Sequence, residues 1–410
     1  MSNKFNIVQK PKKSDDSNEE EVEVEVDVDS DDDEDVSSSK NDFLKHRMTS
    51  FMLIVIGVLC LLLLVLYLIS LGSNKKYTYS DVEKILKEAA ISYFADHPEH
   101  LPTSESSIVE IDSSNLVSAG KMKNISEYLG ADTVCSGTVQ VAKIDTDYVY
   151  TPYLNCGEQY STVELYRKVL SNEKVVSSGY GLYQTNGAYV YRGEIVNNYV
   201  NFGGKMWRIL KITSNNNVVL ISEDGVGYPV PWDDRYSEER LYDAGINTYN
   251  ASRAREYLSR VYTIDDPEDD EFFLSKKNRA KIVPYNICVG KRLPSSSSKD
   301  NSEECKDVLR NQKLGLLTLS EYLYASIDPN CKTADSLSCK NYNYLAKNYD
   351  WWLATANKEN TYSVFMVGRS GAVKPQDAAN YAIMRPVIFL SSGTLYKSGN
   401  GTEEKPYKIR

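Results

Sequence analysis

Seven cysteines are the first residues of this sequence that could do chemistry. All but Cys60 follow residue 130, and an even number there suits disulfide bonding in an oxidising compartment. Several pairings are conceivable, and proximity along the chain favours Cys135–Cys156, Cys288–Cys305 and Cys331–Cys339. The absence of a C-x-x-C motif argues against zinc-ribbon or thioredoxin-type chemistry. A nucleophilic thiol remains the alternative, but the C-terminal region has no histidine to act as its base.

The short stretch "DHPEH", residues 96–100, contains two of the three histidines. Helical spacing of three would help His97 and His100 to share a metal ion, but Pro98 interrupts a helix between them. A metal site also needs further ligands that the sequence does not identify. We therefore expect a solvated helix end, with no metal and no cofactor.

Hydrolysis of a polymer is the catalytic alternative. A glycoside hydrolase needs two carboxylates at a fixed separation in a cleft, and one sequence cannot pair its many carboxylates. Catalytic residues therefore stay unassigned. Whether the chain is an enzyme remains uncertain, and the residues favour a binding protein.

Aromatic side chains offer a binding surface in the C-terminal half. Trp351 and Trp352 are adjacent in a strand pattern, so their side chains point to opposite faces. Burial of both is one interpretation, because tryptophan is highly buried on average. Trp232 lies between prolines and aspartates in "YPVPWDDRY", which is typical of a loop. We predict a ligand site around the hairpin of residues 350–371 and assign to it Trp232, Trp352, Asn357 and Arg369.

The net charge of −10 lies entirely within residues 1–39, which hold four lysines and fourteen acidic residues. The rest of the chain is balanced, so no basic face for nucleic acid is indicated and no nucleic-acid partner is expected. The acidic run and the lack of aromatics predict a disordered cytosolic tail over residues 1–47.

A long apolar run follows the tail. Residues 51–71 contain no charge and would span about 31 Å as a helix, the thickness of a bilayer core. Basic residues before the run favour a cytoplasmic N-terminus. We expect a transmembrane signal anchor over residues 48–72, with Phe51 to Leu71 in the lipid bilayer. The protein would then be a single-pass cell-membrane protein whose C-terminal domains are extracellular.

The next segment predicts a small α+β domain over residues 77–170. Ser80–Glu83 has the form of a capping box, and a helix should follow and stop near Pro98. The segments "GTVQVAKI" and "YVYTPYLNC" read as two strands that Cys135 and Cys156 could join. The pair "CSGTVQV" and "YLNC" resembles pilin-like bacterial surface proteins. The pilin processing site is missing before Phe51, which puts assembly into a pilus in doubt.

After a linker expected at residues 171–187, the pattern becomes dense in strands. Residues 197–212 predict two strands around Gly203 and Gly204, and residues 218–222 predict a third. Residues 250–262 show a helical stripe, and Thr318–Glu321 forms a second capping box. The late segments "WWLAT", "YSVFMV" and "IMRPVIFL" predict further strands.

Residues 188–410 as a whole resemble a bacterial family of C-type-lectin-like extracellular domains, related in fold to formylglycine-generating enzymes. The segments that carry the resemblance are "YVNFGGKMWRILKI", "GLLTLSEYLYA", "DWWLAT", "MRPVIFL" and "SGNGTEEKPYKI". The resemblance implies an α+β head and ligand binding. Calcium-dependent lectin motifs and the cysteine pair of formylglycine-generating enzymes are not matched, so neither a calcium-bridged sugar site nor sulfatase-type oxidation is implied.

These observations predict a membrane-anchored α+β surface protein with a small domain and a lectin-like head. The predicted function is binding of an extracellular glycan, envelope polymer or protein. An envelope-polymer hydrolase with paired carboxylates and a pilin-like assembly subunit are the alternatives.

Overall fold

The computed structural model describes residues 51–64, 77–104, 107–144, 147–235, 245–263 and 274–410. The chain divides into two compact units, Met1–Lys75 and Lys76–Arg410. The expected acidic tail, residues 1–47, belongs to the first unit and lies outside the described residues.

The prediction of a membrane-spanning helix is wrong for the part of the chain that the structure describes. Residues 51–64 are helical, and this described part of the apolar run amounts to about 21 Å, less than a bilayer core of about 30 Å. No described helix is long and apolar enough to cross a membrane. This finding contradicts the predicted single-pass anchor and the cell-membrane location inferred from it. The expected contact of Phe51 to Leu71 with a lipid bilayer loses its support for the same reason. Residues 65–71 of the expected span lie outside the described residues.

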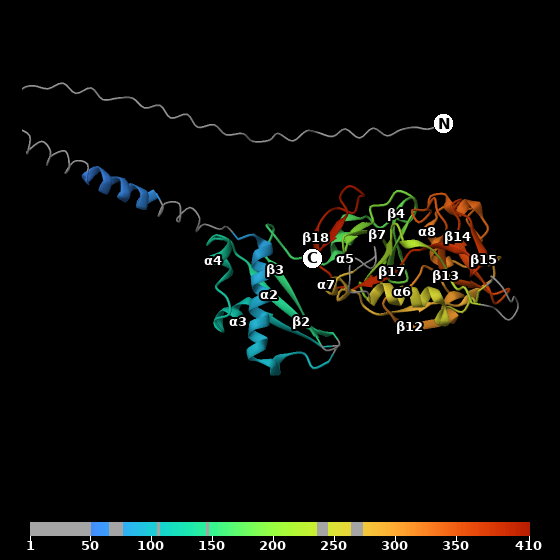
Figure 1. Cartoon of the computed structure of the whole chain (residues 1–410), viewed down its shortest axis with the longest axis horizontal. Coiled ribbons are helices and arrows are strands. Elements are labelled where there is room, and N and C mark those ends of the chain that lie inside the picture. Colours follow the sequence, from blue (N-terminus) through green and yellow to red (C-terminus); the bar gives the residue numbers. More distant parts are fainter. Residues whose placement is uncertain (1–50, 65–76, 105–106, 145–146, 236–244, 264–273) are drawn as a thin grey trace, which may run out of the picture. The chain divides into compact units, whose positions relative to one another are not determined.

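The second unit contains two separate hydrophobic cores, which define two domains. We call residues 77–160 the small domain and residues 165–410 the head. Both combine helices with sheets (Figure 1), antiparallel in the small domain and mainly antiparallel with some parallel pairs in the head, so the α+β class is right for this unit.

The small domain packs one long helix, α2, on a three-stranded antiparallel sheet of order β1-β2-β3. Its helices and strands are α2 (Tyr79–Asp96), η1 (Pro98–His100), β1 (Ile108–Asp112), α3 (Ser113–Ser118), α4 (Ile125–Leu129), β2 (Ser136–Ile144) and β3 (Asp147–Asn155). The helix begins two residues earlier than expected, because Thr78 is its N-cap and Asp81 completes the capping box. The Cys135–Cys156 disulfide lies at the Ser136–Asn155 end of the β2–β3 pair, as predicted.

The head contains two large sheets and a small β-ribbon. One sheet has the order β17-β8-β7-β6-β19-β18, with β5 beside β7 and β4 beside β5. Its strands are β4 (Gly181–Thr185), β5 (Ala188–Arg192), β6 (Tyr199–Phe202), β7 (Lys205–Ile212), β8 (Val218–Ser222), β17 (Val387–Leu390), β18 (Tyr396–Ser398) and β19 (Tyr407–Ile409). Strand β19 pairs in parallel with β6, so the first and last parts of the head share one sheet.

The second sheet has the order β15-β14-β13-β16-β9, with β11 beside β13. Its strands are β9 (Val226–Pro231), β11 (Lys291–Arg292), β13 (Trp351–Asn357), β14 (Ser363–Val367), β15 (Val373–Asp377) and β16 (Tyr381–Met384). The ribbon pairs β10 (Tyr285–Cys288) with β12 (Val308–Gln312). The helices of the head are α5 (Leu165–Asn172), η2 (Tyr249–Ala251), α6 (Arg253–Thr263), α7 (Lys276–Arg279), η3 (Glu304–Lys306), α8 (Leu319–Ala325) and η4 (Leu337–Lys340).

The predicted strands and turns of the head are largely confirmed. Gly203 and Gly204 turn the chain between β6 and β7 with positive φ angles, which glycine adopts at no steric cost. The expected domain boundary is too late, however. Leu165 and Val169 of α5 are fully buried in the head core, and Leu182 of β4 is buried with them. Residues 171–187 are therefore not a free linker, since they include a paired strand.

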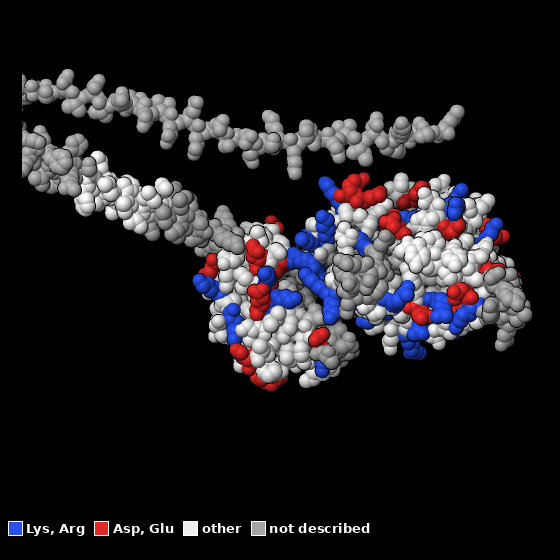
Figure 2. Space-filling model, in the orientation of Figure 1, with Lys and Arg blue, Asp and Glu red and all other residues white. Residues whose placement is uncertain are grey.

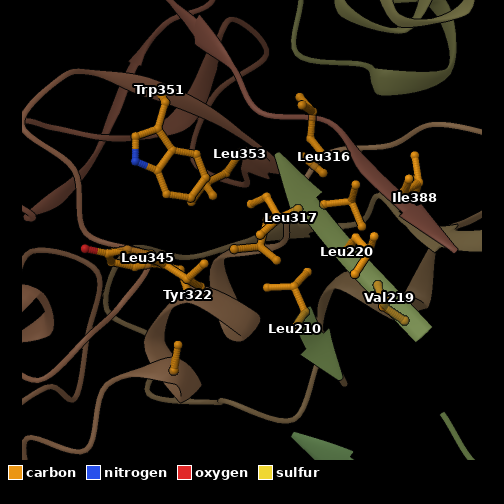
Figure 3. Close-up of a cluster of buried hydrophobic side chains, with 14 of the residues drawn as sticks. Leu210, Val219, Leu220, Leu316, Leu317, Tyr322, Leu345, Trp351, Leu353 and Ile388 are labelled. Atoms are coloured by element: carbon orange, nitrogen blue, oxygen red, sulfur yellow. The ribbon is translucent and has the colours of Figure 1, made fainter. Parts of the chain in front are cut away.

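The centre of the head is apolar and closely packed. Figure 3 shows Trp351 and Leu353 on β13 facing Tyr322 of α8 and leucines of the other sheet. The Trp351 and Tyr322 rings meet edge to face with centroids 5.8 Å apart. The Arg385 guanidinium lies 4.7 Å from the Trp351 ring and donates to the carbonyls of Ser222 and Leu345. Cation and ring thereby stabilise the contact between the two sheets.

All three expected disulfides are present: Cys135–Cys156, Cys288–Cys305 and Cys331–Cys339. Cys60 is the free cysteine. Within the head, the Cys288–Cys305 bond joins the end of β10 to η3, and the Cys331–Cys339 bond closes the segment after α8. Both bonds lie next to the loops that form the cleft described below.

Candidate functional site

The structure places the two predicted tryptophans inside the head. Trp232 and Trp352 have no solvent-exposed surface. The Trp232 indole donates to the carbonyl of Leu353 at 3.1 Å, and the Trp352 indole donates to that of Val230 at 2.9 Å. Trp351 is equally buried, so both adjacent tryptophans belong to the core. The prediction that Trp232 is available for stacking on a ligand is wrong, because both faces of its ring are packed.

The other two predicted residues, Asn357 and Arg369, do not form a ligand site with the tryptophans. Asn357, at the end of β13, is buried and donates to Ser363 at 3.0 Å. Arg369 is exposed and lies beside Asp350, next to the start of β13. A seven-residue strand is roughly 20 Å long, so the two side chains lie at opposite ends of β13. The predicted hairpin site is therefore not formed.

A cleft of about 440 Å³ lies elsewhere on the head. Its volume falls within the range of small-molecule sites, about 300–1,000 Å³. The β4–β5 hairpin, β7, α8 and the loop after β11 all contribute to its walls. The apolar and aromatic lining residues are Ala188, Val190, Tyr191, Leu210, Tyr324, Ala325 and Tyr344, and the polar ones are Thr185, Asn186, Lys211, Ser298, Lys299, Asp300, Asn301 and Glu321.

An ion pair between Lys211 and Glu321 forms one polar wall of this cleft. The Lys211 Nζ lies 2.7 Å from Glu321 Oε1, and about a quarter of each side chain is exposed. The capping box predicted from the sequence is confirmed here, because Thr318 is the N-cap of α8 and its backbone N–H donates to Glu321 Oε2. The start of α8 thus orients the carboxylate toward β7, where Lys211 meets it.

Another wall is the loop of residues 298–301, which a buried ion pair holds in place. Arg292 and Glu304 lie 3.1 Å apart with no exposed side-chain surface. Arg292 also donates to the carbonyls of Ser296 and Ser298, each at 2.9 Å. On its other side, Glu304 accepts hydrogen bonds from the Ser320 hydroxyl of α8. One network therefore fixes the loop relative to the helix that carries Glu321.

The loop presents one cation and one anion to the cleft. Lys299 donates to the carbonyl of Cys331 at 2.5 Å, and burial followed by the charge of Arg192 lowers the pKa of its ammonium group. Asp300 accepts a hydrogen bond from the Ser298 hydroxyl at 2.7 Å. Hydrogen bonds from Ser302 and Ser298 hold the pKa of the Asp300 carboxyl well below its usual range.

Glu321 is ionised as well. Burial raises the pKa of its carboxyl, but the charge of Lys211 and hydrogen bonds from Lys211 and Thr318 more than offset burial and leave the pKa lowered. A glycosidase needs one carboxylic acid that keeps its proton near neutral pH. The pKa values of both carboxylates in this cleft are lowered, which is the opposite of what such a proton donor needs.

A second hollow, of about 540 Å³, includes the predicted residue Arg369. Lys340 and Lys347 line it too, but Lys347 is paired with Glu223 and Arg369 with Asp350. Its wall has few apolar side chains, with Tyr342 and Ala346 as the main ones. The first cleft combines apolar walls with convergent polar groups, which is the usual form of a ligand site.

Sequence analysis missed Lys211, Lys299 and Asp300. Glu321 had a signal, because its place in a capping box located it at the start of a helix. Lys211 is the single charged residue in the otherwise apolar end of β7, "ILKI", and a cation in such a strand indicates a buried partner. The serine-rich loop offered no signal, since its position depends on the buried pair Arg292–Glu304, which no local sequence pattern reveals.

Metal ligands do not gather in the cleft. Among the described residues, the His, Cys, Asp or Glu side chains close enough to share one ion are His97, Glu99 and His100 of the small domain. Acidic and basic side chains are interspersed on the visible surface of the head (Figure 2).

A family model described as a domain of unknown function (DUF6273) matches residues 215–392. The match covers α8 and the loop of residues 298–301, but it begins after Lys211. Comparison with curated proteins and with solved structures finds no match. The resemblances to C-type-lectin-like domains and to pilin-like proteins therefore stay predictions.

Proposed function

We propose that the head is a binding domain for a saccharide or a similar hydroxyl-rich ligand without net charge, and that the ligand enters the cleft beside Lys211 and Glu321. The observation that carries the proposal is this cleft of about 440 Å³, in which apolar walls meet a part-exposed ion pair. A volume of this size lies in the range of small-molecule sites.

The charges that line the cleft balance one another. Lys211 and Lys299 are opposed by Glu321 and Asp300, so a strongly charged ligand gains little net attraction. A sugar hydroxyl both donates and accepts hydrogen bonds, and ionised side chains of both signs form strong hydrogen bonds with it. This pattern favours a neutral polar ligand over an acidic or a basic one.

The walls offer the complementary apolar surface. Tyr324, which is half-buried, is held by Arg192, whose guanidinium lies 4.3 Å from its ring and donates to its backbone carbonyl. Leu210, Val190 and Ala325 add aliphatic surface. Because these residues lie on strands and a helix, the site is preformed, and binding requires little ordering of side chains.

Three disulfides support a ligand found outside the reducing cytosol. A glycan or an envelope polysaccharide is a hydroxyl-rich ligand of this kind. A binding role also agrees with the predicted likeness of the head to C-type-lectin-like domains.

The experiment is a screen of the full-length oxidised chain against an array of neutral, acidic and basic saccharides, followed by calorimetric titration of the strongest neutral ligand. Glu321→Gln and Asp300→Asn each remove one anionic acceptor from the cleft. We expect each substitution to weaken binding at least tenfold, because a hydrogen bond to a charged group contributes about 1.5–3 kcal/mol.

Glu404→Gln is the matched control, because Glu404 is an exposed carboxylate that does not line the cleft. It should bind as the parent does. Thermal unfolding of each variant separates lost binding from lost folding, and the exposed Asp300 serves as the second variant if Glu321→Gln fails to fold. The proposal is wrong if no neutral saccharide binds, or if the bound saccharide tolerates both cleft substitutions.

A further inference from the structure

Three exposed side chains gather just after α2 in the small domain, namely His97, Glu99 and His100. Tyr93 packs beside His97 and His100, and Glu99 lies between the two histidines in the sequence. The ligand atoms of His97, Glu99 and His100 all lie within 4.8 Å of one another. All three side chains are substantially exposed.

The backbone explains how the histidines meet. His97 is the C-cap of α2 and is followed by η1, whose first residue is Pro98. The His100 N–H donates to the His97 carbonyl at 3.1 Å, which closes a 3₁₀ turn. Side chains three residues apart eclipse one another in such a turn. Pro98 starts this turn, and the imidazole rings of His97 and His100 are stacked with centroids 5.6 Å apart. The predicted solvated helix end is confirmed, because these side chains are exposed.

Two of the distances between these ligand atoms are close to those around a transition-metal ion. His97 Nδ1 lies 3.3 Å and His100 Nε2 lies 3.8 Å from Glu99 Oε1. Ligands at zinc bond lengths in a tetrahedron are about 3.3 Å apart. The three ligand atoms lie within 4.8 Å of one another, so rotation of these exposed side chains would have to bring them to that spacing. Two imidazoles and one carboxylate suit Zn²⁺ and its neighbours, whereas Mg²⁺ and Ca²⁺ prefer oxygen ligands alone.

Tyr93 supplies the outer contact that histidine ligands commonly have. Its hydroxyl lies 3.2 Å from His100 Nδ1. In the tautomer with its proton on Nδ1, His100 donates to Tyr93 and keeps the Nε2 lone pair for a metal ion. The ring of Tyr93 also lies against both imidazoles, with centroids 4.7 Å from His97 and 6.1 Å from His100.

We infer that His97, Glu99 and His100 form a surface site for a divalent transition-metal ion of the zinc type, oriented by Tyr93. Three protein ligands leave a further coordination position open for water or for a donor atom of another molecule. The site is independent of the cleft in the head, because it uses none of its residues.

The test is titration of the full-length oxidised chain with Zn²⁺ in a large excess of Mg²⁺, which occupies carboxylates of low selectivity. We expect one Zn²⁺ per chain. Co²⁺ in its place should give the visible absorption of an ion with nitrogen ligands in a low-symmetry environment. His97→Ala, Glu99→Gln and His100→Ala should each weaken Zn²⁺ binding at least tenfold.

Two further variants make the outcome specific. His46→Ala removes the third histidine of the chain and should leave binding unchanged. Tyr93→Phe keeps the ring but removes the hydroxyl, and it should weaken binding about tenfold, as is typical when an outer-shell partner is lost. Absence of Zn²⁺ binding, or binding that persists after both His97→Ala and His100→Ala, would overturn the inference. Circular dichroism shows whether each variant is folded.

Discussion

Arg292 and Glu304 form an ion pair 3.1 Å long in which neither side chain has exposed surface. The pair joins the loop of residues 298–301 to the start of α8, so it supports both polar walls of the cleft. Its hydrogen bonds to Ser296, Ser298 and Ser320 satisfy most of the polar atoms that burial would otherwise leave without partners.

Glu304→Gln should destabilise the head by about 3–5 kcal/mol, because it leaves the Arg292 charge buried and uncompensated. Urea unfolding of the oxidised chain measures this loss. Glu256→Gln is the control, since Glu256 forms an exposed pair with Arg253 at 2.9 Å and should change stability by less than about 1 kcal/mol. Equal effects of the two substitutions would contradict the structural role of the buried pair.

Trp232→Ala should destabilise the head by about 3–5 kcal/mol, because it removes a fully buried indole and its hydrogen bond to Leu353. Tyr228→Ala is the matched control, since Tyr228 lies on β9 close by in sequence and is 73% exposed. Thermal unfolding of the two variants and the parent measures this difference in stability. If the Trp232→Ala variant has the same melting temperature as the parent, the prediction of an accessible tryptophan is restored.

The ion pair in the cleft predicts a specific pH dependence. The pKa of Glu321 is lowered from 4.5 in the folded protein, so folding favours its ionised form. The stability that Glu321 contributes is therefore fully present above pH 4.5, and it is lost as the pH falls through the lower pKa of the folded state. The difference in unfolding free energy between the parent and Glu321→Gln should stay constant from about pH 7 to about pH 5 and shrink at lower pH. A difference that shrinks already above pH 5 would contradict this assignment.

Removal of the Cys331–Cys339 bond should affect both stability and the cleft. The double substitution Cys331→Ser, Cys339→Ser should destabilise the head by about 2–3 kcal/mol, because the unfolded chain loses a constraint. It should also weaken ligand binding, since the Cys331 carbonyl accepts the hydrogen bond from Lys299. Cys60→Ser is the control and should alter neither property, because Cys60 is outside every disulfide.

Local patterns in the sequence were enough to predict most secondary structure and the disulfides. Gly203 and Gly204 marked a turn, Thr318 and Glu321 marked a helix start, and near neighbours among the cysteines proved to be bonded. These features depend on residues a short distance apart. Conformational preference and proximity therefore determine them with little influence from the rest of the fold.

The candidate sites depended on contacts that no local pattern carries. Trp232 was placed in a loop correctly, yet the loop folds inward and its indole finds Leu353, 121 residues away in the sequence. Lys211 and Glu321 likewise meet across 110 residues. For the two histidines, Pro98 was read as a helix breaker, and its capacity to start a 3₁₀ turn was overlooked.

The parallel pairing of β19 with β6 has a consequence for synthesis of the head. Strand β6 is translated some two hundred residues before β19, and until residues 407–409 emerge it lacks its partner on that side. An unpaired strand edge is a template for association with other chains. A nascent or truncated head that stops short of Tyr407 would therefore leave this edge of β6 without its partner, open to pairing with another chain.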